Sequence, residues 1–375
     1  MLRPALHDPE PTTSAGPAAS ATAARMVGLD SLRGLAILAV IAFHVAIRFP
    51  PPGLVATATA YGYVGVQLFF VVSAISMCYM WDQRRGERAP VRSFLIRRLC
   101  RIAPPFWFGI AFYMAWRQLG FLADSPAGPV DVVLTATFLH GFVPSAINRV
   151  VPGGWSIAVE VGFYVLFPMM ILHIGGAWRR VATALAAWLC CTAAATVIRA
   201  HAGPDIDLFL YYSLLTQLPV FIVGMAIYSV GVKGERPPLL ATLGVVGLWF
   251  ALALAARALG WPGRPGLWLQ VALLGGFAAV VIGRFESRWL AFAGRFSYSA
   301  YLFHFAVLDL VSRAVPDALR HGLLPFAGAL AATCLGTAAI AWASSRTLEA
   351  WSIAYGRALV RRVNGAPALA KQPSA

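Results

Sequence analysis

The chain has 375 residues, of which 59% are hydrophobic and only 12% are charged, whereas soluble domains carry about a quarter charged residues. This composition excludes a cytosolic enzyme, a disordered scaffold and a secreted disulfide protein, and it indicates a polytopic membrane protein. The formal net charge is +15. Because the basic residues lie between apolar segments, we expect no nucleic acid partner; the expected partners are the lipid bilayer and anionic small molecules.

Ten segments are apolar and long enough to cross a bilayer, which takes about 20 residues each. Residues 1–28 lack apolar periodicity and predict a disordered cytoplasmic tail. The transmembrane region is 29–345, and the tail 346–375 is basic. The first apolar run has no small-residue cleavage site, so we expect no signal peptide. The predicted spans are 31–49, 61–81, 103–122, 155–174, 181–199, 208–230, 239–259, 265–283, 296–314 and 323–344.

Segment 130–147 is also apolar, but it contains His140 and Pro144. We predict either a half-helix or an outer-face loop there. The sequence therefore predicts an all-α membrane protein with about ten transmembrane helices.

The orientation follows from the Lys and Arg residues that flank the spans. With the N-terminus inside, 21 of the 30 basic residues lie on the cytoplasmic side and 8 outside, and Arg33 lies within a span. We therefore predict that both termini are cytoplasmic, which agrees with an even number of spans, and that the protein resides in the inner membrane.

Arg33 and His44 are ionisable residues within the first span. Such residues cost at least ~2.5 kcal/mol by insertion scales and mark functional candidates. They are eleven residues apart, so both lie on one helical face, separated by about 16 Å along the axis. This indicates a polar channel. The alternative is an interfacial arginine with a hydrogen-bonded core histidine, and the pair alone does not separate the two interpretations.

Two further candidates occur in later spans. Glu160 lies near the predicted depth of His44, where a carboxylate can orient an imidazole base; the alternative is a structural hydrogen bond. His304 follows a polar cluster that either lines a cavity or joins helices. We favour the joining role for Tyr298 and Tyr301 and leave His304 open.

The stretch RRLCRIAPP, residues 97–105, places Arg98 and Arg101 on one helical face. Guanidinium groups match phosphate geometry, so this pair could hold a nucleotide-bearing donor. The alternative is a topology signal with lipid headgroup contact, which the charge count by itself favours. The five cysteines have no CxxC or metal-ligand spacing, so we expect no metal and no disulfide; they are Cys78, Cys100, Cys190, Cys191 and Cys334.

Five segments together resemble acyltransferase family 3, a family of integral membrane acyltransferases. LDSLRGLAILAVIAFHV resembles its opening pattern, with ten residues between Arg33 and His44. The other elements are GYVGVQLFFVVSAIS, FLIRRLCRIAPPFW, WSIAVEVGFYVLFP and SYSAYLFH, in family order over residues 29–304. Gln67 stands where the family commonly has Asp, and Ala74 where it usually has Gly.

The resemblance implies transfer of an acyl group, usually acetyl, from cytoplasmic acyl-CoA to a hydroxyl of a surface polysaccharide, lipopolysaccharide or lipid-linked sugar. It also implies that His44 is catalytic with Arg33 essential beside it, and that Arg98 and Arg101 contact the coenzyme. We hypothesise that His44 acts as a general base assisted by Glu160; an acyl-histidine intermediate is the alternative.

Two other classes of protein suit part of this pattern. A transporter that exports a metabolite or glycan also has many spans with intramembrane charge, but the chain lacks internal symmetry and paired broken-helix signals. A sensor or scaffold with a degenerate site would not need intact Arg33, His44, Arg98, Arg101 and Glu160.

Overall fold

The computed structural model describes residues 17–121, 126–203, 206–235, 251 and 286–365, and these segments are helical with no strand among them. The helices are α1 Pro17–Arg48, α2 Gly53–Ala60, α3 Gly65–Arg84, α4 Pro90–Gln118, α5 Pro129–Ala136, α6 Trp155–His173, α7 Ala177–Ala202, α8 Asp207–Tyr212, α9 Leu214–Ile227, α12 Arg288–Arg295, α13 Ser297–Ala314, α14 Leu323–Ser344 and α15 Ala350–Asn364. The all-α fold class is thus confirmed.

Six helical stretches of the described chain are long and apolar enough to cross a membrane. They correspond to six of the ten predicted spans; they are Val27–Arg48, Gly53–Arg84, Trp155–His173, Ala177–Ala202, Asp207–Val232 and Leu323–Asn364. Two further predicted spans are helical over residues 103–118, in α4, and over residues 297–314, in α13, but these helices are not among the six. Predicted span 265–283 lies outside the described residues, and so does all of 239–259 except residue 251.

One element boundary differs from the sequence-based one. Helix α1 begins at Pro17, upstream of the predicted limit at residue 29. Segment 130–147 takes the half-helix form, with the short helix α5 followed by a 3-10 turn at Leu139–Phe142. All five cysteines are free thiols in the structure.

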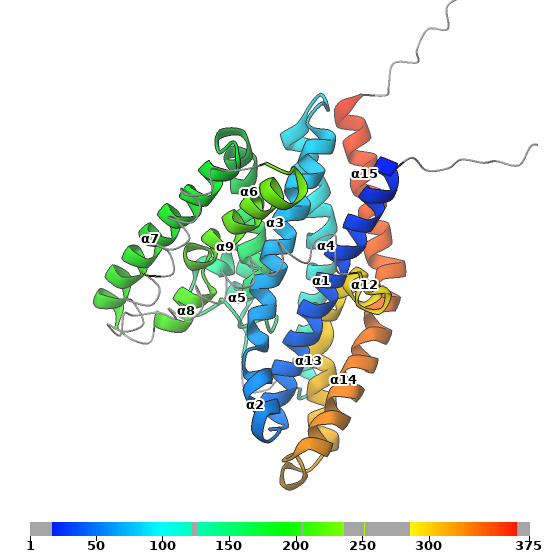
Figure 1. Cartoon of the computed structure of the whole chain (residues 1–375). Coiled ribbons are helices and arrows are strands. Elements are labelled where there is room, and N and C mark those ends of the chain that lie inside the picture. The colour runs from blue at the N-terminus through cyan, green and yellow to red at the C-terminus, as the bar shows by residue number, and fades with distance from the viewer. Residues whose placement is uncertain (1–16, 122–125, 204–205, 236–250, 252–285, 366–375) are drawn as a thin grey trace, which may run out of the picture.

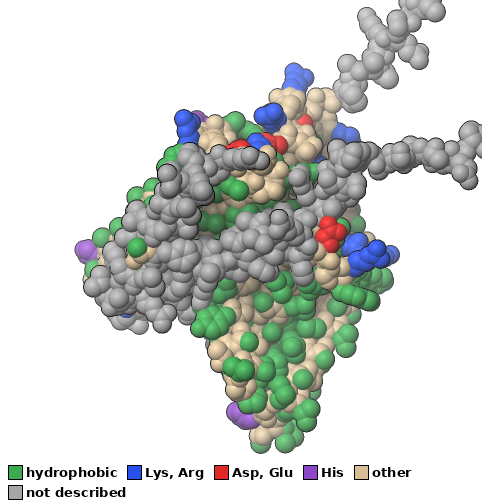
Figure 2. Space-filling model, in the orientation of Figure 1, with side chains coloured by type: hydrophobic (Ala, Val, Ile, Leu, Met, Phe, Trp, Pro, Cys, Tyr) green, Lys and Arg blue, Asp and Glu red, His purple; other side chains and the backbone are tan. Residues whose placement is uncertain are grey.

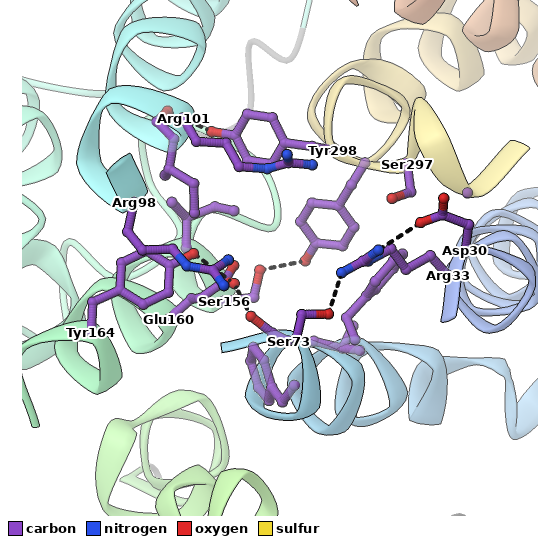
Figure 3. A pocket seen from close by; sticks show the side chains of 18 of the residues that line it. Asp30, Arg33, Ser73, Arg98, Arg101, Ser156, Glu160, Tyr164, Ser297 and Tyr298 are labelled. Atoms are coloured by element: carbon purple, nitrogen blue, oxygen red, sulfur yellow. Dashed lines mark hydrogen bonds and ion pairs between the residues drawn. The ribbon is translucent and has the colours of Figure 1, made fainter. Parts of the chain in front are cut away.

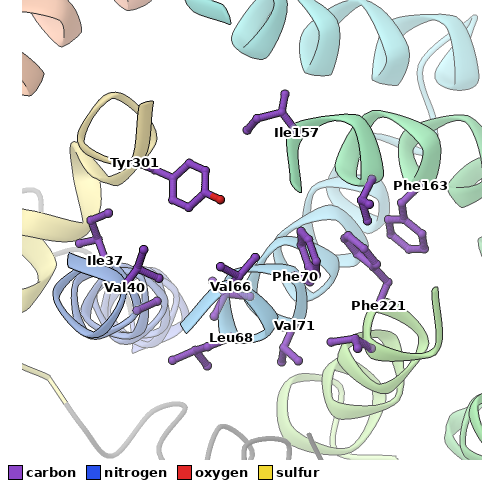
Figure 4. Packing of buried hydrophobic residues seen from close by; sticks show 14 of the residues in the cluster. Ile37, Val40, Val66, Leu68, Phe70, Val71, Ile157, Phe163, Phe221 and Tyr301 are labelled. Carbon is purple, nitrogen blue, oxygen red and sulfur yellow. The ribbon is translucent and has the colours of Figure 1, made fainter. Parts of the chain in front are cut away.

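The helices form one bundle with a side group (Figure 1). Helices α1, α3, α4, α13, α14 and α15 make the main bundle, and α6 to α9 pack beside it through contacts of α9 with α3. Buried apolar side chains from α1, α3, α6, α9 and α13 meet in one core, where Phe70 stacks on Phe221 with ring centroids 4.6 Å apart (Figure 4). This core fixes the positions of the helices that carry the polar candidates.

The two ends of the bundle differ in surface chemistry (Figure 2). Hydrophobic side chains cover the lower part of the view, below α12, where α2 and the first turns of α14 lie. Blue side chains of Lys and Arg gather at the upper end, around α15 and the start of α4. The bundle therefore has one strongly basic end.

Helices α1 and α12 touch through their backbones. A Cβ atom on Gly34 would lie 2.0 Å from the Leu290 carbonyl oxygen, and one on Gly294 would lie 1.8 Å from the Asp30 carbonyl oxygen. No side chain larger than hydrogen fits at either position. The two glycines therefore fix α12 against the turn of α1 that carries Arg33.

Helices α14 and α15 are joined without a loop by a π-helical turn, Ser345–Glu349. The Glu349 carboxylate is buried there and accepts a hydrogen bond from Ser299 on α13. Ser299 Oγ also lies 2.9 Å from Ser344 Oγ, and because Ser299 gives its only hydrogen to Glu349, Ser344 donates this second bond. Residues that we predicted to be a tail are thus a helix that returns to the bundle and packs along α4.

Candidate functional site

A cavity of about 340 Å³ lies between α1, α3, α4, α6 and α13 (Figure 3). It has the size of small-molecule sites in proteins. Its wall contains four of the predicted residues, Arg33, Arg98, Arg101 and Glu160. The wall also contains polar side chains that the sequence did not single out, chiefly Ser73, Ser76 and Tyr164.

Arg33 reaches the cavity from α1 and is held by two neighbours. Its Nη1 lies 2.6 Å from Asp30 Oδ1, one turn earlier, and its Nη2 donates to Ser76 Oγ at 2.6 Å. The side chain is 19% exposed. The guanidinium is therefore fixed in direction toward the cavity while its charge is partly balanced.

Arg98 is buried on α4 and has no carboxylate within ion-pair distance in the described part of the chain. Its guanidinium carbon lies 5.8 Å from the Phe94 ring centroid and 5.7 Å from that of Tyr164. Its Nε has no hydrogen-bond partner there. A buried cation without an ion-pair partner is costly, so this side chain favours a bound anion. Arg101, one turn further on, is exposed and lines the same cavity.

Glu160 lies in the cavity wall on α6. It accepts hydrogen bonds from Ser73 Oγ at 2.5 Å and from Tyr164 Oη at 2.8 Å. These contacts tie α6 to α3 beside Arg98. In the described chain His44 makes no contact with Glu160, so the structure brings Glu160 together with the arginines and not with the predicted base.

His44 contacts a second histidine, His304 of α13. Nδ1 of His44 lies 2.9 Å from the Val40 carbonyl oxygen and 3.4 Å from Nε2 of His304. Nδ1 of His304 lies 2.7 Å from the Tyr301 carbonyl oxygen. Since a carbonyl oxygen only accepts, each Nδ1 carries the hydrogen when the rings are neutral. Nε2 of His44, without a partner among the described residues, then has its lone pair available.

Aromatic rings surround this histidine pair. The ring centroid of Phe305 is 4.4 Å from that of His44, and Phe43 is 5.0 Å away. Tyr301 links the pair to the cavity, because it lines the cavity while its carbonyl holds His304. The Tyr301 hydroxyl also accepts a hydrogen bond from Ser156, at 2.9 Å.

The turn before α6 positions Ser156 and Glu160. Gly153 has φ +74° and its carbonyl accepts a hydrogen bond from Tyr301 Oη at 3.1 Å. Nε2 of His140 lies 3.1 Å from the Gly154 carbonyl oxygen. Burial lowers the pKa of His140, so its ring is neutral and acts as a structural donor to this turn.

The two departures from the family pattern have local explanations. Gln67 is buried and its Nε2 donates to Gln217 Oε1 at 3.3 Å and to the Tyr211 hydroxyl at 3.2 Å. Ala74 is buried against α9, where a Cβ on Gly224 would lie 2.8 Å from the Ala74 Cβ. The close helix approach is therefore provided here by the glycine of the opposite helix.

Comparison with known proteins places these residues in a family context. A family model described as an acyltransferase domain matches residues 26–345. The exopolysaccharide production protein ExoZ of Rhizobium meliloti (strain 1021) is 28% identical over 289 residues, which are 74% of this chain and 87% of ExoZ.

Two O-acetyltransferases match over shorter stretches. The peptidoglycan O-acetyltransferase OatA of Listeria monocytogenes is 24% identical over 38% of this chain and 24% of its own length. The O-acetyltransferase OatA of Staphylococcus aureus (strain NCTC 8325 / PS 47) is 22% identical over 39% of this chain and 25% of its own length. The chain thus spans about a quarter of each of these longer relatives. No solved structure matches it.

Proposed function

The chain belongs to this acyltransferase family, and on that premise we propose that it is an inner-membrane O-acyltransferase. It moves an acyl group, acetyl in the first instance, from acyl-CoA to a hydroxyl of a surface glycan, a lipopolysaccharide or a lipid-linked sugar. Relatives named for exopolysaccharide production and for peptidoglycan O-acetylation support a glycan as the acceptor.

The observation that carries this proposal is buried Arg98 in the cavity wall. It lies next to exposed Arg101 and has no carboxylate partner in the described chain. Paired guanidinium groups suit the bidentate geometry of phosphate oxygens. The diphosphate of acyl-CoA supplies such oxygens, and the cavity continues from these arginines past Arg33 to Tyr301. The acyl end of the donor is then directed toward the histidine pair.

His44 is the general base in this mechanism. Its Nε2 takes the proton of the acceptor hydroxyl as that oxygen attacks the thioester carbonyl carbon. Collapse of the tetrahedral intermediate breaks the carbon–sulfur bond, and the proton on His44 passes to the leaving thiolate. The products are the ester and free CoA. An acylated His44, trapped after incubation with donor alone, would replace this route by an acyl-histidine intermediate.

His304 and Glu160 have supporting roles in the proposal. Nε2 of His304 faces Nδ1 of His44 at 3.4 Å, so it orients the base and is a positioning residue. Glu160 holds Ser73 and Tyr164 in the wall beside Arg98. Through these two hydrogen bonds it helps to shape the acyl channel.

The donor side is proposed to be cytoplasmic, with both termini inside. The basic end of the bundle supports this orientation. Arg88→Cys and Thr57→Cys, each in a cysteine-free background, test it with an impermeant thiol reagent on intact cells, because both positions are exposed. We expect labelling at position 57 and none at 88. The reverse pattern would place the arginines outside, away from any CoA.

The activity itself is tested in the cell and with purified protein. Surface glycans from a deletion strain should lack an acyl ester, detected by mass spectrometry, that the wild-type gene restores and the His44→Ala gene does not. Purified protein in nanodiscs should release CoA thiol from acetyl-CoA only when the glycan acceptor is added. Ester loss without any thiol release would favour a transporter over an enzyme.

A further inference from the structure

A second cavity of about 510 Å³ opens at the basic end of the bundle. It shares Met80, Arg98 and Arg101 with the first cavity, so the two adjoin at these side chains. Arginines dominate its wall; they are Arg84, Arg97, Arg98, Arg101, Arg357 and Arg361. We call it the arginine pocket.

Helix α15 supplies two of these arginines and is fixed firmly to α4. A Cβ on Gly356 would lie 2.7 Å from the Cys100 Cβ, so the helices are in close contact there. Asn364, at the other end of α15, donates to Ser93 Oγ at 2.9 Å and accepts from the Ala89 amide at 3.2 Å.

Arg357 and Arg361 are four residues apart and lie on the same face of this fixed helix. Both belong to a segment beyond the family-matched residues 26–345. The pocket is therefore built partly from a feature outside the matched domain.

The charge of the pocket is largely uncompensated. Arg97 has an ion pair with Glu87 at 2.5 Å, whereas the other five arginines have no carboxylate within ion-pair distance in the described residues. Like charges that line one cavity raise its positive potential and concentrate anions there. A ligand with several negative charges fits this wall better than a single phosphate does.

We propose that the arginine pocket binds the 3′-phosphorylated nucleotide end of acyl-CoA, and that Arg357 and Arg361 bind its 3′-phosphate. This inference rests on the proposed function. The coenzyme carries a diphosphate and a ribose 3′-phosphate, with about four negative charges in total. With the diphosphate at Arg98 and Arg101, where the cavities meet, the nucleotide extends into the arginine pocket and the acyl arm into the first cavity. Helix α15 then selects CoA over donors that lack the 3′-phosphate.

Binding of CoA and of 3′-dephospho-CoA to full-length protein in nanodiscs tests this assignment. We expect wild type to bind CoA at least ~10-fold more tightly than dephospho-CoA, the size of a lost charge-assisted contact. In Arg357→Gln/Arg361→Gln the affinity for CoA should fall to that for dephospho-CoA, whose own affinity should not change. Arg362→Gln, an exposed neighbour outside the pocket wall, is the matched control and should behave as wild type.

Other outcomes overturn the inference in distinguishable ways. If the double variant loses affinity for CoA and for dephospho-CoA equally, or keeps both affinities, α15 does not recognise the 3′-phosphate. The double variant could also lose the preference for CoA over dephospho-CoA in phosphatidylglycerol nanodiscs and keep it in phosphatidylcholine nanodiscs. That result would assign the pocket to lipid phosphate. If wild type binds neither ligand and releases no thiol, the proposed function fails as well; binding of both without preference removes only this inference.

Discussion

The two ends of the proposed donor path differ in charge. At the α15 end, arginines surround open space and five of them have no carboxylate partner in the described chain. At the other end, His44 and His304 each face a backbone carbonyl, with phenylalanine rings around them. The first environment favours a bound anion, whereas the second leaves Nε2 of His44 without a partner among the described residues. Donor affinity and chemistry should therefore respond to different substitutions.

Loss of His44 should give the largest change. His44→Ala should lower the rate of transfer by about 10²- to 10⁴-fold, because it removes the base, and leave CoA binding intact. Thiol release with a fixed acceptor measures this. His201→Ala is the matched control, since Nδ1 of His201 also bonds the carbonyl four residues earlier, at 2.8 Å, but on an exposed surface. A His44→Ala protein that retains more than a few per cent of activity would remove His44 from the mechanism.

Arg98→Ala should separate affinity from stability. We expect CoA affinity to fall by roughly 10- to 100-fold, since a charge-assisted contact to phosphate is lost. The melting temperature without ligand should stay equal or rise, because a buried cation without an ion-pair partner is removed. Arg92→Ala, exposed on the same helix, should change neither quantity. Lower stability with unchanged CoA affinity would make Arg98 a structural residue.

Substitution of His304 should have a moderate effect on turnover. His304→Ala should lower kcat by about three- to tenfold, the value of one neutral hydrogen bond, with the donor KM unchanged. His304→Gln can place an acceptor oxygen near the former Nε2 and should recover part of the loss. Equal impairment in both variants would indicate a packing role alone.

Gly34→Ala should lower the stability of the fold. Among these variants it should change turnover per folded molecule the least. Its Cβ would meet the Leu290 carbonyl at 2.0 Å, and such overpacking costs typically ~1–3 kcal/mol. A lower melting temperature is expected. Gly328→Ala in α14, with no atom within 4 Å of the new Cβ, should be neutral. If both variants melt alike, the contact between α1 and α12 is not rigid.

The sequence predicted which candidate residues share a face of one helix. It did not predict which helices bring those residues together. Helical spacing placed Arg33 and His44 on one face, and Arg98 beside Arg101. Which residue contacts His44 depends on how α13 packs against α1, and periodicity within one helix does not encode that. We therefore paired His44 with Glu160 by depth, whereas its neighbour is His304.

The residues we missed had weaker signals. Ser73 and Ser76 are three apart in an apolar run and so lie on one face, a spacing that would have found them. Arg357 and Arg361 show helical spacing too, but a basic C-terminal segment is usually a topology signal. The packing of α15 on α4, at Gly356 against Cys100 and at Asn364 against Ser93, brings these arginines to the cavity. Most of the predicted span 239–259 and all of 265–283 lie outside the described residues, so the full span count stays a prediction.

The π-helical turn at Ser345–Glu349 takes up one extra residue where α14 continues into α15. A π turn holds one residue more than the α-helical turn it replaces, and each residue of an α-helix advances the azimuth by about 100°. Deletion of one residue from this turn would preserve the length and composition of α15 almost unchanged. It would also leave Arg357 and Arg361 directed into the arginine pocket, because an α-helical turn with one residue fewer completes the same revolution. An extra residue in an unbroken α-helix would instead rotate both side chains by about 100°, so the π turn absorbs that residue without changing their direction.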